Sequence, residues 1–235
     1  MKRLLNIALD NAVALGVVVI VLFLIIPLPT FLLDFLLIVN IGLAIMILMI
    51  TMNISEALEF SIFPSLLLVT TLFRLGLNVS STRMILRDGY AGEVIQNFGQ
   101  LITGGNIVIG VVIFLIIVLV QFIVITKGAE RVAEVAARFT LDAMPGKQMA
   151  IDADLSSGLI NEQEARARRQ KIQKEADFYG AMDGATKIVK GDAVMSIVIT
   201  LINFVGGVII GMVMGGGDFT TVLQTYSIVT IGDGL

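Results

Sequence analysis

Five long runs of apolar residues constrain the fold of this chain more than any other feature. The clearest run is IVIGVVIFLIIVLVQFIVIT, which covers residues 107–126 without a charged side chain before its end. A helix needs about 20 mostly apolar residues to cross a bilayer. The other candidate spans are residues 12–28, 31–50, 60–79 and 193–214. We therefore predict an all-α integral membrane protein, a polytopic bundle of transmembrane helices with a small helical cytoplasmic insertion.

The composition agrees with a membrane-embedded chain and limits its chemistry. Hydrophobic residues make up 57% and charged residues 15% of the 235 residues, whereas soluble domains average about 45–50% apolar and about 25% charged residues. The chain contains no cysteine and no histidine, which excludes disulfides, thiolate metal sites and imidazole proton relays. Proton transfer by this chain therefore depends on Asp, Glu, Lys, Arg or Tyr side chains.

The distribution of basic residues predicts which segments face the cytoplasm. Most of the 16 lysines and arginines lie in residues 127–192, and the positive-inside rule places such loops in the cytoplasm. Lys2 and Arg3 place the N-terminus there too, ahead of a first span that we predict is retained rather than cleaved as a signal peptide. An even number of crossings must then precede residue 127. This parity requires residues 60–79 to cross the membrane, despite Arg74 within them.

These assignments divide the chain into four parts. We predict transmembrane helices 1–4 in residues 1–126, a cytoplasmic loop at 127–192, transmembrane helix 5 at 193–214, and an external loop leading toward a further span at 215–235. Arg83 and Arg87 would then lie outside, against the positive-inside rule. A re-entrant or interfacial element within residues 80–105 would resolve this conflict.

Three polar side chains fall inside the predicted spans, namely Asp34, Arg74 and Asn203. A charge at the bilayer centre costs about 2.5–3.5 kcal/mol on insertion scales, so such residues tend to face protein or water and to mark functional sites. Structural roles remain open for all three. Asp34 lies near the start of its helix and can cap it, Arg74 can extend to the outer interface, and Asn203 can hold helices together.

Glycines recur every fourth residue in the fifth span, at Gly207, Gly211 and Gly215. Small residues at this spacing share one helix face and allow another helix to approach closely. We therefore predict a packing role for this face, in a crowded bundle or an oligomer.

The cytoplasmic segment begins with a charged helix. Arg131, Glu134 and Arg138 share one face, and Asp142 follows one turn later. Glu134 and Arg138 have the favourable i,i+4 order for an ion pair. Met144-Pro145-Gly146 is expected to break this helix. A solvated amphipathic helix accounts for the charges, but not for their crowding next to the membrane.

A second cytoplasmic helix is predicted further along the segment. Asn161 and Glu164 have the spacing of a capping box, in which each side chain bonds the other residue's backbone N–H. Glu162 with Arg166, and Glu164 with Arg168, supply i,i+4 pairs. The sequence ARARRQKIQKEA is then a soluble helix, one member of a small helical hairpin.

The last cytoplasmic residues gather charge just before the fifth span, at Asp183, Lys187, Lys190 and Asp192. Asp192 can be a helix N-cap or a partly dehydrated carboxylate at the inner mouth of the bundle. Burial raises the pKa of a carboxylate and nearby lysines lower it, so such a group can exchange protons near neutral pH. Without histidine, Asp192 is the strongest candidate for a proton carrier.

Other functions find little support. Gly146-Lys147-Gln148 lacks the Ser or Thr and the first glycine of a phosphate-binding loop, and residues 152–163 lack the glycine and the terminal Glu of a calcium loop. We predict no catalytic residue, no metal, no cofactor and no enzymatic activity. Bases in the cytoplasmic segment are matched by acids, so we also predict no nucleic-acid binding.

Four long motifs resemble the FHIPEP family of flagellar and type III secretion export gates. They are LFRLGLNVSSTRMIL, QFIVITKGAERVAEVAARF, RFTLDAMPGKQMAIDAD and EADFYGAMDGATKIVKGDA, at residues 72–86, 121–139, 138–154 and 175–193. With the pattern of spans, the resemblance covers essentially the whole chain.

The resemblance implies a homononameric ring in the bacterial inner membrane that helps convert proton motive force into protein export. It implies contacts with membrane lipid and with other export-gate subunits. A large C-terminal domain absent from this chain would dock the export ATPase complex and substrate–chaperone complexes. The charged positions implied in coupling are Arg131, Arg138, Asp142 and Asp192, with Asp183 and Lys187 in the same motif as Asp192.

Three alternatives to a flagellar export gate remain open. The chain can belong to a virulence secretion gate, or it can be a stand-alone transporter or ion channel that uses Asp34 or Arg74. It can also be a structural ring component whose charges serve assembly alone.

Overall fold

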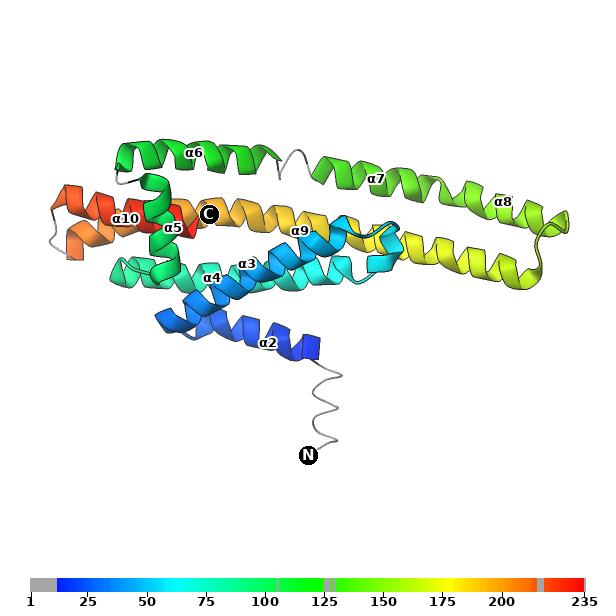
Figure 1. Ribbon diagram of the computed structural model, residues 1–235, viewed down its shortest axis with the longest axis horizontal. Coiled ribbons are helices and arrows are strands. Elements are labelled where there is room, and N and C mark those ends of the chain that lie inside the picture. The colour runs from blue at the N-terminus through cyan, green and yellow to red at the C-terminus, as the bar shows by residue number, and fades with distance from the viewer. Residues whose placement is uncertain (1–11, 105, 125–127, 129, 215–217, 235) are drawn as a thin grey trace, which may run out of the picture.

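The structure of the chain is a computed structural model, and its helices form an elongated array (Figure 1). It describes residues 12–104, 106–124, 128, 130–214 and 218–234. Every regular element in these residues is helical, which confirms the predicted all-α class. The elements are α2 (Ala12–Ile25), α3 (Thr30–Met52), η1 (Ala57–Phe60), α4 (Phe63–Asp88), α5 (Glu93–Thr103), α6 (Ile107–Ile123), α7 (Glu130–Asp142), α8 (Met144–Ser156), α9 (Glu162–Met214) and α10 (Phe219–Asp233).

Three of the described helices, α3, α4 and α9, are long and apolar enough to cross a membrane. Together, α5 and α6 meet the same criteria as a pair bent by 100°. With the family comparison below, these helices make the chain a multi-pass membrane protein. The helical part of the first predicted span, α2, has only 14 described residues, and α6 has 17. The short helix α5 lies in the region where we predicted a re-entrant or interfacial element.

The helices alternate in direction, so that two groups of connections gather at opposite ends of the array. Figure 1 shows the α3–α4 connection on the same side as the hairpin formed by α7, α8 and the first half of α9. An ion pair of 2.9 Å between Glu56 and Lys171 joins that connection to α9. The turn between α4 and α5, the last residues of α9 and the first residues of α10 lie at the other end (Figure 1). The order of the membrane crossings and the side that faces the cytoplasm stay predictions.

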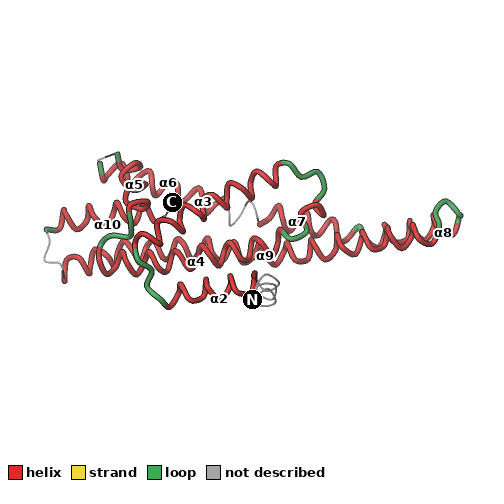
Figure 2. Tube along the Cα trace, turned by 60° about the horizontal axis from the view of Figure 1, so that its bottom comes forward, coloured by secondary structure: helices red, strands yellow, loops and turns green. Residues whose placement is uncertain are grey.

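Helix α9 continues without a break from the cytoplasmic segment into the predicted fifth span. It has 53 residues, or about 80 Å at 1.5 Å per residue, and Figure 2 shows it along most of the molecule. Asp192 lies inside this helix, so its interpretation as a helix N-cap is wrong. The sequence changes from polar to apolar near residue 192, but residues 162–214 contain no proline that would end a helix there.

The hairpin of α8 and α9, called the arm below, has a small apolar core of its own. Met144, Ile151, Ala165 and Ile172 form this core. The predicted capping box at the start of α9 is confirmed, because Glu164 N–H donates to Asn161 Oδ1 at 2.8 Å and Asn161 N–H donates to Glu164 Oε2 at 3.1 Å. The predicted break before Pro145 is also confirmed, since α7 ends at Asp142 and α8 begins at Met144.

Helix α10 forms where the sequence indicated only an external loop. Its residues Val222, Tyr226 and Val229 belong to the main core of the bundle, together with Leu77 and Ile85 of α4. It packs against α5 and α9. Residues 219–233 therefore return into the helix bundle after the turn that follows α9.

The glycine face of α9 receives an aromatic ring from α10. A Cβ added at Gly207 or Gly211 would meet the ring of Tyr226 at a distance below 3.0 Å. Gly207 is buried and Tyr226 is only 6% exposed. These glycines lie at an intramolecular helix contact, and Gly215 lies outside the described residues.

Candidate functional site

An ion pair between α4 and α9 lies where the two longest helices of the bundle pack along each other. Arg74 Nη2 lies 2.9 Å from Asp192 Oδ2, and the Asp192 side chain is 6% exposed whereas that of Arg74 is 44% exposed. The second carboxylate oxygen, Asp192 Oδ1, is buried and accepts no hydrogen bond from the described residues. The sequence singled out both residues but did not predict that they meet.

Burial and the Arg74 ion pair have opposite effects on the ionisation of Asp192. Burial disfavours the ionised carboxylate, and Arg74 favours it. Buried ion pairs gain little net free energy because desolvation offsets their attraction, whereas removing one charge of the pair is strongly unfavourable for the other. A proton on Asp192 would therefore weaken the contact between α4 and α9.

Polar and small side chains continue from Asp192 along the same face of α9. They recur every three or four residues, the spacing of one helix face, at Asp192, Ser196, Thr200, Asn203, Gly207 and Gly211. Helix α4 places Arg74, Asn78 and Ser81 at the same kind of spacing. We call these two rows, which run along the packed pair of α4 and α9, the polar seam.

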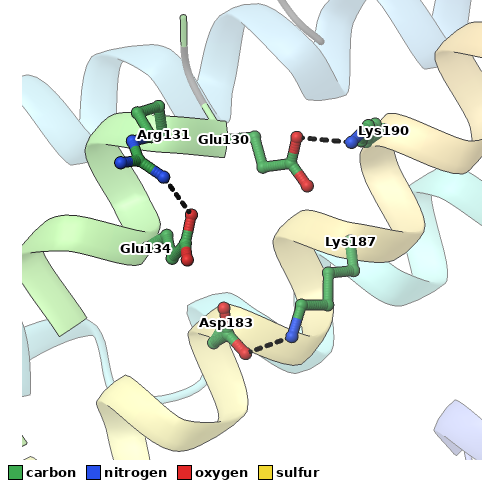
Figure 3. Close-up of polar contacts among 6 residues, drawn as sticks. All are labelled: Glu130, Arg131, Glu134, Asp183, Lys187 and Lys190. Carbon is green, nitrogen blue, oxygen red and sulfur yellow. Dashed lines mark hydrogen bonds and ion pairs between the residues drawn. The ribbon is translucent and has the colours of Figure 1, made fainter. Parts of the chain in front are cut away.

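A second set of charges surrounds the start of α7, where this helix packs on α9 (Figure 3). Lys190 Nζ lies 2.6 Å from Glu130, and Lys187 Nζ lies 2.7 Å from Asp183. Arg131 pairs with Glu134 at 3.4 Å within α7. The ion pair between Lys190 and Glu130 ties α7 to α9 two residues before Asp192, so this cluster and the Arg74–Asp192 pair share one stretch of α9.

Lys187 is a fixed positive charge in this cluster. The hydrogen bond and the charge of Asp183, and the charges of Glu134 and Glu130, raise the pKa of Lys187 above its ordinary 10.5. The lysine thus stays protonated at neutral pH. Among the predicted proton-coupling residues, Lys187 can position other groups but does not exchange protons there.

The structure does not bring Arg138 and Asp142 to the other coupling candidates. They pair with each other at 3.7 Å on the outside of α7, with side chains 80% and 70% exposed. The predicted Glu134–Arg138 pair is replaced by the pairs of Glu134 with Arg131 and of Arg138 with Asp142. Exposed pairs of this kind contribute little to stability, so the two residues are free to bind another molecule.

The predicted intramembrane residue Asn203 leads to a carboxylate that sequence analysis missed. Asn203 is fully buried, and its Nδ2 donates to Asp233 Oδ2 at 2.9 Å. The available signal was an acidic residue at the end of an apolar segment, IVTIGDGL, which the prediction of an external loop left unexamined.

Asp34 and Arg83 hold helix ends at the far side of the bundle. Asp34 accepts hydrogen bonds of 3.0 Å from the N–H groups of Glu93 and Val94, so it caps α5 rather than its own helix. Arg83 donates to the carbonyl oxygens of Leu24 and Ile25, at the end of α2, at 2.9 and 3.1 Å. A carboxylate at a helix N-terminus and a cation at a C-terminus both oppose the helix dipole. These contacts give the two charges structural roles.

A comparison with protein-family models identifies the family of this chain. The FHIPEP family model matches residues 20–235, and the match includes both residues of the Arg74–Asp192 pair, the charged cluster at α7 and the whole arm. This chain belongs to the FHIPEP family.

Relatives of the FHIPEP chain occur in several bacteria. It is 58% identical to the flagellar biosynthesis protein FlhA of Bacillus subtilis, over 96% of the chain and 33% of the relative. It is 52% identical to the low calcium response locus protein D of Yersinia pestis, over 96% and 32%. It is 53% identical to the invasion protein InvA of Salmonella typhimurium, over 93% and 32%. The chain spans about a third of the length of these curated relatives. No solved structure matches it.

The FHIPEP chain shows no metal site in its described residues. No group of three or more acidic side chains there converges as metal ligands would. What the arrangement provides instead is a set of carboxylates whose charge is balanced by single cations or hydrogen-bond donors, at the contacts between α4, α7, α9 and α10.

Proposed function

We propose that this chain is part of the membrane component of a flagellar type III protein export gate in the bacterial inner membrane, and that it couples the proton motive force to the export of flagellar proteins. Membership of the FHIPEP family and the likeness to FlhA support the export function. The observation that supports proton coupling is the buried Asp192, paired with Arg74 at the point where α9 enters the bundle.

Protonation of Asp192 is the proposed coupling event. The neutral acid keeps at most a weak hydrogen bond to Arg74, so the attraction between α4 and α9 falls. Arg74 is partly exposed and can then turn toward water. Because α9 is one continuous helix, a tilt or rotation at residue 192 also moves its first residue, about 45 Å away at 1.5 Å per residue. The arm therefore follows the protonation state of a single carboxylate.

The charged cluster around α7 determines which helices move together with α9. Lys190 and Glu130 tie α7 to α9, so the two helices move together on that side. Lys171 and Glu56 tie α9 to the α3–α4 connection. In this proposal the N-terminus and residues 127–192 face the cytoplasm. The arm, and α7 with its exposed charges Arg138 and Asp142, face other copies in a homo-oligomeric ring or other subunits of the gate.

Replacement of Asp192 by Asn tests the proposal in the full-length protein. Asp192→Asn keeps the shape of the side chain but cannot carry a proton, so we expect export of flagellar proteins and proton flux into vesicles to be lost while membrane insertion and assembly persist. Asp177→Asn is the matched control, because Asp177 is an exposed carboxylate on the same helix that accepts a hydrogen bond from Gln173. Normal export by Asp192→Asn would refute proton transfer at this residue. Lost export with unchanged proton flux would leave the pair a structural role.

A virulence secretion gate is the second candidate. The relatives from Yersinia and Salmonella, one of them named for invasion, share 52% and 53% identity with the chain. Complementation of deletion strains distinguishes the two: restored motility supports a flagellar gate, and restored secretion of virulence proteins without motility supports the alternative.

A further inference from the structure

A cavity lies inside the bundle between the Arg74–Asp192 pair and Asp233. Its volume is about 240 Å³, enough for several water molecules. Its polar lining comes from several helices, with Asn40 of α3, Asn78 of α4, and Ser196 and Thr200 of α9. Arg74 lines the cavity from one end, and Asp233 from α10 lines it as well.

Three residues that contact the cavity lining without being part of it have buried polar atoms that lack protein partners in the described part of the chain. Asn203 is fully buried, and its Oδ1 accepts no hydrogen bond from the described residues, although its Nδ2 donates to Asp233. Thr230, 2% exposed on α10, and Asp192 each have a buried oxygen in the same condition. Buried polar groups are costly unless they are hydrogen-bonded. Since these residues contact the lining through Asp233, Arg74 and Gly234, water in or next to the cavity is the partner that fits them.

Asp233 has a hydrogen-bond donor but no adjacent cation among the described residues. The bundle part of α9, from residue 193 onward, and all of α6 contain no charged side chain. On α5 the only charge is Glu93, which belongs to the end held by Asp34. On α4, Arg83 and Arg87 are engaged with the α2 carbonyls and with Asp88. Arg74, already paired with Asp192, is the cation that shares the cavity with Asp233.

The ligand that fits Asp233 is a proton rather than a metal ion. A metal cation of the size of Na⁺ or Ca²⁺ needs several converging oxygen ligands. Here Asn203 turns its NH₂ group toward the carboxylate, and a donor hydrogen in that place repels a cation. A carboxylate with one side-chain donor and no adjacent cation can become neutral by taking up one proton, which removes the cost of a charge inside the bundle.

We propose that Asp233 is a second proton-binding carboxylate of this chain and that the water-accessible cavity connects it with Asp192. Along α9, Asn203, which donates to Asp233, lies 11 residues beyond Asp192, or about 16 Å along the helix axis at 1.5 Å per residue. The polar seam covers this distance with the side chains of Ser196, Thr200 and Asn78.

The transfer requires no other chemical group. A proton that enters from the side of the bundle where α10 begins binds Asp233 and neutralises it. It then leaves Asp233 for water in the cavity, which restores the carboxylate, and passes along the seam to Asp192. Arg74 at the far end keeps a positive charge in the path, so a proton reaches Asp192 only when the Arg74–Asp192 pair opens. This order of events rests on the function proposed for Asp192.

Infrared difference spectroscopy tests the inference directly. The full-length protein in liposomes is compared at acidic and neutral pH, and the signal of each protonated carboxyl is assigned by subtracting the spectrum of a variant. We expect Asp233→Asn to lose one carboxyl signal and to reduce proton flux at least tenfold. Asp218→Asn is the matched control, because Asp218 caps the same helix from an exposed position and Asn caps equally well; it should change neither quantity.

The outcomes separate this inference from the function proposed for Asp192. An unchanged spectrum for Asp233→Asn, or a signal that differs between Na⁺ and K⁺ buffers, would overturn the inference. If Asp233→Asn loses its signal while Asp192→Asn transports normally, the second carboxylate stands and the coupling role of Asp192 fails. Should Asp233→Asn not insert, Asp233→Glu supplies the answer, because it keeps a carboxyl that must still gain a proton and sustain flux.

Discussion

A methyl group added to α9 at Gly207 should separate helix α10 from the bundle. The new Cβ would lie closer than 3.0 Å to the ring atoms Cγ, Cδ1 and Cε1 of Tyr226, a separation that side-chain carbons do not tolerate. The Tyr226 ring is 6% exposed and belongs to the main core, so it has no free space into which to turn. Overpacking of this kind costs about 1–3 kcal/mol.

The neighbouring glycine provides the control that isolates this cost. A Cβ at Gly206 meets only the flexible end of Leu86, at 3.4 Å. Both positions lie within α9, so Gly→Ala brings the same gain in helix propensity, about 1 kcal/mol, at each. The difference in unfolding free energy between Gly207→Ala and Gly206→Ala is therefore the steric term alone, about 1–3 kcal/mol.

The assay follows from the absence of cysteine in the chain. Two introduced cysteines, at the exposed positions Val205 of α9 and Gln224 of α10, accept a pair of fluorophores that report the separation of the helices during unfolding in mixed micelles. Tyr226→Ala should remove the penalty of Gly207→Ala, giving a coupling energy in the double-mutant cycle. Equal stability of Gly206→Ala and Gly207→Ala would show that α10 does not pack on this face.

Three further predictions concern the other contacts of the fold. Asp34→Ala should cost about 1–2 kcal/mol because it removes a helix cap, and hydrogen exchange should become faster at the first amides of α5. Ile172→Ala should destabilise the arm by about 2–5 kcal/mol because Ile172 lies in its core, whereas Leu159→Ala, at a residue 75% exposed, should leave its resistance to proteolysis unchanged. The contact of Lys187 with Asp183 raises the pKa of the lysine, so it stabilises the fold below the ordinary pKa of 10.5 and is lost as the pH rises through the raised value; a titration from pH 6 to 9 should not alter the Lys187 resonance.

Hydropathy and helix signals were sufficient to predict the elements that depend on local sequence. The apolar runs gave α3, α4 and α6, and the capping box gave the start of α9 because both partners lie within one turn. Asp34 shows where such reasoning stops. Its carboxylate near the start of α3 matched a cap for its own helix, but it caps α5, 59 residues further along the chain. No local pattern distinguishes these two uses of one side chain.

The candidate site was predictable in its members and not in its pairings. The sequence identified Arg74 as a charge within a span and Asp192 as a carboxylate at the inner mouth of the bundle, but it did not show that the two residues pair. Asp233 was missed because α10 has only 15 residues, too few to be recognised as a span. Short helices that fold back into a bundle are stabilised by burial against their neighbours, which a hydropathy profile of one segment does not contain.

The continuity of α9 unites these observations. If the helix ended at the membrane, the arm could move independently of Asp192. Because α9 is one helix of 53 residues, a change in charge at Asp192 can move both of its ends. The exposed charges Arg138 and Asp142 then need no contact with Asp192 to take part in the proposed coupling, because an ion pair between Glu130 and Lys190 joins α7 to α9. Arg138, Asp142 and Asp192, which the sequence analysis grouped by charge, are thus joined through the rigid helix α9 and the helix α7 paired with it. Their separation in the structure is consistent with a common function.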